Sequence, residues 1–240
     1  MVVDTLAVVP ARGGSKGLAG KNIRPFLGRP LIDWSLEVGE LCPSVKRTVL
    51  TSDSEDYLER AHHFSKAVPL LRPAALAQDH SPMSGVIAHA TRAEADDDIV
   101  FVLLLDPTSP IRNPSEIEDA LDQLRENPHF VGAASMSQPE FNMRWVGVEL
   151  DDHKAIRRAF PGGSGYASRQ EVPPLWRMNG TFYIWRASLA KDLSDPWLEK
   201  GPHLGIETPE ERAFSIDTLR EFEIAEIMLK SGLIDWEVPH

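Results

Sequence analysis

The sequence predicts an α/β protein built on a doubly wound, mostly parallel sheet. Short apolar segments alternate with helix-like segments along most of the 240 residues, as in repeated β-α-β units. Residues 99–105 are continuously apolar, which is typical of a central strand buried on both faces. Polar residues directly follow several apolar segments, where ligands bind in such sheets. A chain of this length is expected to form one domain, 1–240.

The first half of the chain shows the alternation most clearly. The apolar segment 6–9 predicts a first buried strand, and the apolar spacing of 31–38 predicts a helix. A short strand is expected at 48–50 and a helix at 56–65, with Ser54 as its candidate N-cap. A helix over 82–95 then precedes the central strand at 99–105.

The second half begins with a helix at 114–126, for which Asn113 is the candidate cap and Pro114 suits the first position. Strands are expected at 131–136, 145–150, 181–185 and 214–216, and a closing helix at 218–230 with Thr218 as its cap. Residues from about 138 to 178 include an irregular stretch rich in Gly and Pro. We interpret them as an insertion that flanks the site rather than as a separate domain.

The most informative stretch follows the first strand and runs from Ala11 to Asn22. A Gly-rich turn after a buried strand exposes several backbone N–H groups in one small arc, which forms an anion-binding nest. Arg12, Lys16 and Lys21 add cationic side chains to that arc. Because fixed cations and N–H donors together suit a chain of phosphates, we interpret this loop as a nucleoside triphosphate clamp.

Other phosphate-binding loops do not fit these residues. The Walker A pattern fails at both ends, since Ser15 stands at the first glycine position and Asn22 at the final Ser/Thr. The dinucleotide fingerprint fails because no two glycines in the loop have the spacing Gly-x-Gly. The remaining alternative is a basic surface turn whose glycines permit positive φ.

Composition excludes several other classes of function. The formal net charge of −11 argues against a nucleic-acid binder, and no apolar run is long enough to span a bilayer. The N-terminus lacks a signal peptide pattern, and a single cysteine, Cys42, suits the reducing cytoplasm. Histidine spacing predicts no zinc site. We therefore expect a cytoplasmic protein without membrane or nucleic-acid partners.

The loop and four later segments resemble the acylneuraminate (CMP-sialic acid) cytidylyltransferase family. The matches occur in the family's order and span nearly the whole chain. They are Pro10-Ala11-Arg12-Gly13-Gly14-Ser15-Lys16-Gly17 … Lys21-Asn22, Arg72-Pro73 … Leu76-Ala77-Gln78-Asp79, Pro107-Thr108-Ser109-Pro110-Ile111-Arg112, Arg169-Gln170 … Pro173 with Asn179-Gly180 … Tyr183-Ile184, and Ile216-Asp217-Thr218 … Ala225-Glu226.

The resemblance implies a Rossmann-like (GT-A-like) nucleotidyltransferase that transfers CMP from CTP to the anomeric hydroxyl of a nonulosonic, sialic-type acid and releases pyrophosphate. It implies a homodimer, to whose interface the insertion contributes. It also implies that the nucleotide is bound by the loop and by Arg72, which matches the position that reads cytosine. The implied nucleotide-binding residues are Ala11, Arg12, Gly13, Ser15, Lys16, Lys21, Asn22 and Arg72, with Arg12 and Lys21 also acting on the charge that develops during transfer.

The expected cofactor is Mg²⁺, which takes hard oxygen ligands and bridges phosphate oxygens. Asp217 matches the family's metal-binding aspartate, but Ser215 stands where the family has a second carboxylate. Asp106 stands where the family has a sugar-binding Gln. Asp106 therefore has three interpretations: a replacement metal ligand, a contact to the acceptor sugar, or a turn residue before Pro107.

The acceptor is itself an acid, so its carboxylate needs a cation. Arg169 matches the family residue for that role, and a guanidinium can pair with a carboxylate through two bonds. The resemblance also places Thr108, Ser109, Asn179 and Tyr183 near the acceptor. Two alternatives stay open: an enzyme that transfers CMP to the shorter sugar Kdo, and a nucleotide-binding protein that has lost turnover.

Overall fold

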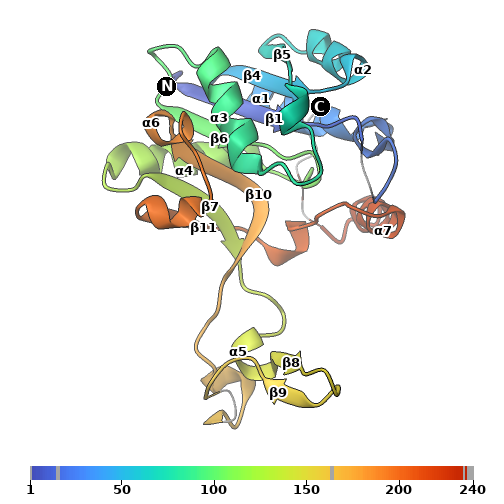
Figure 1. Ribbon diagram of the computed structural model, residues 1–240, viewed down its shortest axis with the longest axis vertical. Coiled ribbons are helices and arrows are strands. Elements are labelled where there is room, and N and C mark those ends of the chain that lie inside the picture. The colour runs from blue at the N-terminus through green and yellow to red at the C-terminus, as the bar shows by residue number, and fades with distance from the viewer. Residues whose placement is uncertain (1, 15–16, 163–164, 235, 237–240) are drawn as a thin grey trace.

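A seven-stranded sheet forms the centre of the computed structural model, which describes residues 2–14, 17–162, 165–234 and 236 (Figure 1). The strand order is β11-β7-β10-β6-β1-β4-β5. β10 alone runs antiparallel to its neighbours, β6 and β7, while all other neighbouring pairs of this sheet are parallel. The strands are β1 (Thr5–Pro10), β4 (Val45–Ser52), β5 (Ala67–Leu71), β6 (Phe101–Leu104), β7 (Gly132–Ser137), β10 (Arg177–Arg186) and β11 (His203–Glu207).

Helices cover both faces of this sheet. Along β1, Ala7 and Val9 pack into one apolar cluster, and Leu6 and Val8 pack into another, because successive residues of a strand point to opposite faces. The first cluster includes side chains of α1 (Leu31–Leu41) and α4 (Pro114–Glu126), and the second includes α3 (Met83–Glu94) and α6 (Ala187–Ala190). The predicted doubly wound, mostly parallel sheet is thus confirmed.

One predicted strand is wrong and another is only partly right. Residues 214–216 form no strand, although the Ile216 N–H donates to the Thr108 carbonyl oxygen at 2.8 Å. The segment 145–150 begins inside a short helix, α5 (Met143–Val146), and only its end forms a strand, β8 (Val148–Leu150). Within the seven-stranded sheet, the two strands that were missed are β5 and β11, which lie at its edges.

The three candidate caps stand at helix N-cap positions as predicted, but only one of them makes a capping bond through its side chain. α4 begins at Pro114, and α7 (Leu219–Lys230) begins after Thr218, whose side chain forms a capping box with Glu221. Ser54 and Asn113 stand at the N-cap positions of α2 (Glu55–Leu58) and α4, but their side chains make no capping bond.

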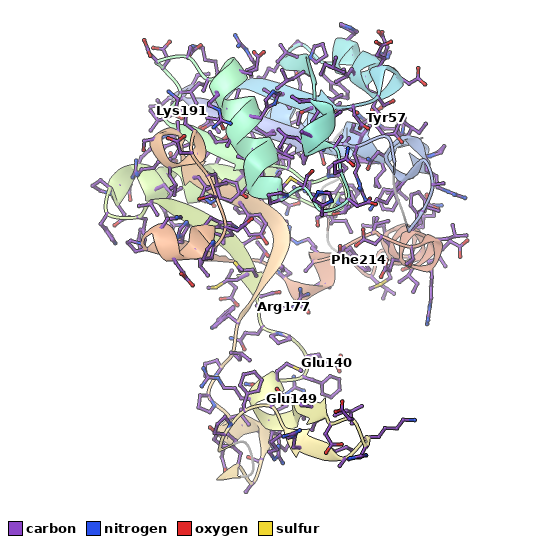
Figure 2. The ribbon with its side chains drawn as sticks, viewed as in Figure 1. Tyr57, Glu140, Glu149, Arg177, Lys191 and Phe214 are labelled. Atoms are coloured by element: carbon purple, nitrogen blue, oxygen red, sulfur yellow. The ribbon has the colours of Figure 1, made fainter. Side chains whose placement is uncertain are left out.

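The chain between β7 and β10 leaves the sheet and forms a projecting arm (Figure 1). Figure 2 shows Glu140 and Glu149 on this arm and Arg177 near its base. The arm contains α5, the hairpin of β8 and β9 (Ile156–Arg158), and a 3-10 turn, Arg169–Glu171. Its exposed apolar side chains are Phe141, Met143, Val146, Val148, Leu150, Ile156 and Phe160.

The remaining elements are small. β2 (Pro25–Phe26) and β3 (Arg29–Pro30) form a separate hairpin before α1. Among the described residues, no helix combines the length and the apolar character needed to cross a membrane.

Candidate active site

A cavity of about 300 Å³ lies at the carboxyl ends of β1 and β6. Pro10 ends β1, and Asp106 follows β6 by two residues, so this is the edge where open parallel sheets bind ligands. The lining residues are Pro10, Arg12, Gly17, Lys21, Asn22, Arg72, Met83, Asp106, Thr108 and Asp217. The structure therefore brings together residues from four of the five segments that carry the family resemblance.

Both described cations of the Gly-rich loop are paired with carboxylates. Lys21 Nζ lies 2.8 Å from Asp217 Oδ1, and the Lys21 side chain is only 9% exposed. Arg12 Nη1 lies 2.5 Å from Asp79 Oδ1. Each cation thus already has an anionic oxygen partner of the type that a phosphate also offers.

The predicted N–H nest is engaged in the same way. The Gly13 N–H donates to Asp53 Oδ1 at 2.8 Å. Ala11 is buried and bonds the Thr51 carbonyl through its N–H at 3.0 Å, so it anchors the start of the loop to β4. Ser15 and Lys16 lie outside the described residues.

Asp217 is fixed in the cavity wall by backbone contacts. A Cβ at Gly17 would lie 2.3 Å from the Asp217 carbonyl oxygen, so the loop and this segment touch in a way that only glycine permits at position 17. The hydrogen bond from Lys21 lowers the pKa of the Asp217 carboxyl, with a smaller contribution from the Ser215 hydroxyl at 3.0 Å. Asp217 is therefore ionised at neutral pH, and Ser215 supports it by donation.

Asp106 forms a turn and also lines the cavity. Its Oδ1 accepts from both the N–H and the hydroxyl of Thr108 at 3.0 Å. Asp106 therefore acts as a turn residue in this structure. Because it also lines the cavity, a metal ion or a sugar bound there could reach its side chain.

The sequence analysis did not identify Arg112 as the residue that supports the backbone of Asp106. The Arg112 side chain is completely buried and donates to the Asp106 carbonyl at 2.5 Å, to Ser35 Oγ at 3.0 Å and to the Thr181 carbonyl. Burial lowers the pKa of the Arg112 guanidinium to about 10, so it remains charged at neutral pH. Arg112 is the last residue of one of the segments that carry the family resemblance. Nothing in the local sequence indicated that its side chain would be buried.

Arg72 and Asn22 are both buried and both line the cavity. Arg72 donates to the Thr51 carbonyl at 2.8 Å, and its Nε has no hydrogen-bond partner among the described residues. Burial lowers the pKa of Arg72. Asn22 Nδ2 lies 3.4 Å from the Arg12 carbonyl oxygen. Arg72 thus lines the cavity, and its buried Nε has no partner in the described part of the chain.

The predicted acceptor residues are more dispersed than the nucleotide residues. Asn179 is buried. Its Oδ1 accepts from Ser135 Oγ and its Nδ2 donates to Thr208 Oγ1, each at 2.7 Å, so it joins β10 to β7 and to the residue after β11. Ser109 is also buried. Neither is among the residues that line the first cavity.

Two further acceptor residues lie outside the first cavity. Tyr183 lines a neighbouring cavity of about 200 Å³, and Met83, which sequence reasoning missed, lines both. Arg169 lies on the arm and donates to the Glu140 carbonyl oxygen. The structure therefore does not bring Arg169 to the cavity of its own chain.

The oxygen donors of the cavity suit Mg²⁺. No group of three or more His, Cys, Asp or Glu side chains with metal-binding geometry occurs within residues 2–14, 17–162, 165–234 and 236. However, Mg²⁺ bound with a nucleotide needs only one or two carboxylates, because phosphates and waters supply the other ligands. Asp106 and Asp217 line the same cavity, so the donor set fits that mode of binding.

Comparison with known proteins decides the family. Residues 6–226 match the family model described as cytidylyltransferase. This chain is a member of the cytidylyltransferase family. It is 27% identical to a pseudaminic acid cytidylyltransferase of Campylobacter jejuni, over 95% of this chain and 97% of the relative. It is 30% identical to a CMP-N,N'-diacetyllegionaminic acid synthase of Legionella pneumophila, over 75% of this chain and 76% of the relative.

Solved structures with low sequence identity share the fold. CMP:2-keto-3-deoxy-manno-octonic acid synthetase complexed with CTP aligns with a TM-score of 0.70 at 17% identity and covers 95% of this chain and 99% of that one. A 4-diphosphocytidyl-2C-methyl-D-erythritol synthase from Anaerococcus prevotii gives 0.68 at 11% identity, over 95% and 96%. The predicted Rossmann-like nucleotidyltransferase fold and the resemblance to acylneuraminate cytidylyltransferases are both confirmed.

Proposed function

We propose that this cytidylyltransferase transfers CMP from CTP to the anomeric hydroxyl of a nonulosonic acid and releases pyrophosphate. One observation carries the proposal: two cations of the Gly-rich loop and two carboxylates, Asp106 and Asp217, line one cavity at the carboxyl edge of the sheet. Cations there suit the triphosphate, and carboxylates suit its metal ion. The relatives named for pseudaminic and diacetyllegionaminic acids support the acceptor class.

The nucleotide is held by residues of the Gly-rich loop, of which Arg12 and Lys21 line the cavity. Arg12 and Lys21, together with Ser15 and Lys16 of the same loop, bind the phosphates. Phosphate oxygens replace Asp79 as the partner of Arg12. Lys21 and Arg12 stabilise negative charge on the departing pyrophosphate, which is the main catalytic demand of such a transfer. Lys21, whose side chain is 9% exposed, is buried beside an anionic partner, which limits the electrostatic cost of burying its charge.

The base and ribose are bound by two further residues that line the same cavity. Arg72 offers the cytosine a buried guanidinium whose Nε is unpartnered among the described residues. Asn22, directly after Lys21, contacts the ribose or the phosphates.

Mg²⁺ is the proposed cofactor, with Asp217 and Asp106 as its protein ligands. When bound, it supplies positive charge to the phosphates and acidifies a coordinated hydroxyl. Lys21 keeps Asp217 ionised and therefore ready to bind a cation. The Thr108 N–H and hydroxyl fix one oxygen of Asp106, which leaves the other oxygen for the ligand.

We also propose a homodimer formed through the arm. The exposed apolar side chains of the arm would be buried by a second copy, which removes an unfavourable contact with water. Arg169 lies on this arm and away from its own cavity, so dimerisation is the way in which it would meet an acceptor carboxylate. Because Cys42 is the only cysteine, the reducing cytoplasm suits this enzyme.

The test is pyrophosphate release from CTP and Mg²⁺ with a panel of nonulosonic acids and Kdo, with products identified by mass spectrometry. We expect a CMP-sugar from at least one nonulosonic acid and none from Kdo. Binding of CTP without pyrophosphate release from any acceptor would refute the proposal. Light scattering at micromolar concentration tests the dimer, and a monomer mass would contradict it.

A further inference from the structure

A third apolar cluster joins the segments that surround the candidate active site. Leu18 contributes from the Gly-rich loop, Ile111 from the segment that follows the Asp106 turn, and Ile216 from the position directly before Asp217. All three side chains are buried in this one cluster. The cluster therefore ties the proposed phosphate-binding loop to the two segments that carry the proposed metal ligands.

The C-terminal tail after α7 completes this cluster. Ile234 and Trp236 are both buried in it. Trp236 is only 8% exposed, whereas Leu233 in the same tail is 72% exposed. The Trp236 ring packs against Trp34 of α1, with ring centroids 5.2 Å apart and an interplanar angle of 56°. Aromatic pairs attract each other at such a separation, so the tail is held by specific contacts with the core.

Trp236 also holds the backbone of Arg112. Its Nε1 donates to the Arg112 carbonyl oxygen at 3.0 Å, and this hydrogen bond is buried. The Arg112 side chain in turn donates to the Asp106 carbonyl oxygen at 2.5 Å. A buried indole N–H and a buried carbonyl each cost free energy when they are unpaired, so the bond between them fixes both groups. Trp236 therefore supports the residue on which the Asp106 turn rests.

The same ring contacts reach the Asp217 side of the site. Trp34, which packs on Trp236, donates through its Nε1 to the Phe26 carbonyl oxygen at 2.9 Å. The Phe26 ring packs edge-on against Phe222 of α7, with ring centroids 5.3 Å apart. Because α7 begins two residues after Asp217, contacts that start at the tail extend to both segments that carry a carboxylate.

We infer that Trp236 is a positioning residue for CMP transfer. It acts through Arg112 and the third cluster, and it fixes the Asp106 carboxylate relative to that of Asp217. Trp236 is not among the residues that line the cavity, so it acts at a distance from the substrates. The inference rests on the proposed function, in which the two carboxylates hold one Mg²⁺. Such a site tolerates displacements of only about 0.5 Å, so loss of a remote support lowers turnover.

A set of variants separates positioning from stability. Trp236→Phe keeps a ring beside Trp34 but removes the donor to the Arg112 carbonyl, and Trp236→Ala removes the ring as well. Leu233→Ala is the matched control in the same tail, because its side chain is exposed. Ile99→Ala controls for lost stability alone, since Ile99 is buried in the second cluster just before β6 begins, at the end of that strand away from the cavity.

The first readout is amide hydrogen exchange of the free protein, which needs no substrate. We expect faster exchange in both Trp236 variants, concentrated in residues 105–112 and 213–218, because these segments lose a common support. The Ile216 N–H donates to the Thr108 carbonyl oxygen at 2.8 Å, so it reports the contact between the two segments directly. Leu233→Ala should exchange as the wild type does, and Ile99→Ala should not concentrate its effect in these segments.

The second readout is pyrophosphate release with an acceptor that the wild type uses, at a temperature where every variant is folded. We expect kcat to fall at least about threefold in Trp236→Phe and at least about tenfold in Trp236→Ala. Both should need more Mg²⁺ for half-maximal activity, while the Kd for CTP should change less than kcat. Leu233→Ala and Ile99→Ala should retain the wild-type kcat.

The outcomes separate this inference from the proposed function. A wild-type kcat in Trp236→Phe, or exchange that is not concentrated in the two segments, would overturn the inference while leaving CMP transfer established. An equal loss of kcat in Ile99→Ala would also overturn it, and if Trp236→Ala does not fold, Trp236→Phe alone decides. Absence of pyrophosphate release from the wild type with every acid would instead refute the proposed function, and the exchange experiment would then decide whether Trp236 holds the two segments together.

Discussion

Replacing Arg112 with methionine should destabilise the protein and impair the site together. The Arg112 guanidinium is fully buried and donates to the carbonyl oxygens of Asp106 and Thr181 and to Ser35 Oγ. Methionine has similar length but no donor, so two carbonyl oxygens lose a buried partner, while the hydroxyl can rotate.

The magnitude follows from these contacts. Each unsatisfied buried carbonyl costs about 1–3 kcal/mol, and removing a desolvated charge returns part of that sum. We therefore expect a net loss of about 2–4 kcal/mol in the free energy of unfolding. For a chain of this size, that loss lowers Tm by about 5–15 °C.

The assay is differential scanning calorimetry beside steady-state pyrophosphate release. The matched control is Arg92→Met, since the Arg92 side chain is 55% exposed and its loss should cost less than about 0.5 kcal/mol. In Arg112→Met the turn that carries Asp106 loses its support, so kcat should fall more than KM changes. A Tm within about 1 °C of the wild type would show that Arg112 does not hold this turn.

Other predictions test the packing and charge of the same region. Gly17→Ala should lower both Tm and turnover, because its Cβ would lie 2.3 Å from the Asp217 carbonyl oxygen. The control is Gly14→Ala, whose Cβ would meet nothing within 4 Å and which should leave Tm unchanged. Equal Tm shifts for the two variants would contradict this prediction. Lys21→Met should raise the pKa of Asp217, which Lys21 holds below its usual value. The stability that this depressed pKa contributes is present at neutral pH and is lost as pH falls through the folded-state pKa, so the Tm difference between wild type and Lys21→Met should shrink in acid, and a constant difference would refute the pairing. Cys42 is buried with its pKa raised to about 12, so a thiol reagent at pH 8 should modify it only after unfolding, and rapid labelling of the native enzyme would be the contrary result.

Local sequence patterns predicted much of the fold but failed where long-range pairing decides. The edge strand β5 contains Pro69, which lowers strand propensity, but an edge strand tolerates proline because one side of its backbone needs no partner. The segment 214–216 has an apolar pattern, yet it packs beside the turn at Thr108 rather than in the sheet. Neither outcome can be read from neighbouring residues alone.

The candidate site was also predicted only in part: its charged residues were predicted, but its buried supporting side chains were not. Arg12 and Lys21 lie in a Gly-rich loop and Asp106 follows a buried strand, so these three residues carried local signals. Asp217 was predicted from the family resemblance, because the strand expected before it does not form. The burial of Arg112 and the burial of Trp236 carried none. Both arise when segments distant in the sequence pack against one another, which requires the structure.

The most direct test of the account is the Mg²⁺ dependence of pyrophosphate release in wild type, Asp217→Asn and Asp106→Asn, with CTP affinity measured in parallel. The account predicts that each variant loses at least about tenfold in kcat and needs more Mg²⁺ for half-maximal activity, while CTP still binds through Arg12 and Lys21. Near-normal turnover and unchanged Mg²⁺ dependence in both variants would contradict it, because the two carboxylates could not then be the metal ligands of this site.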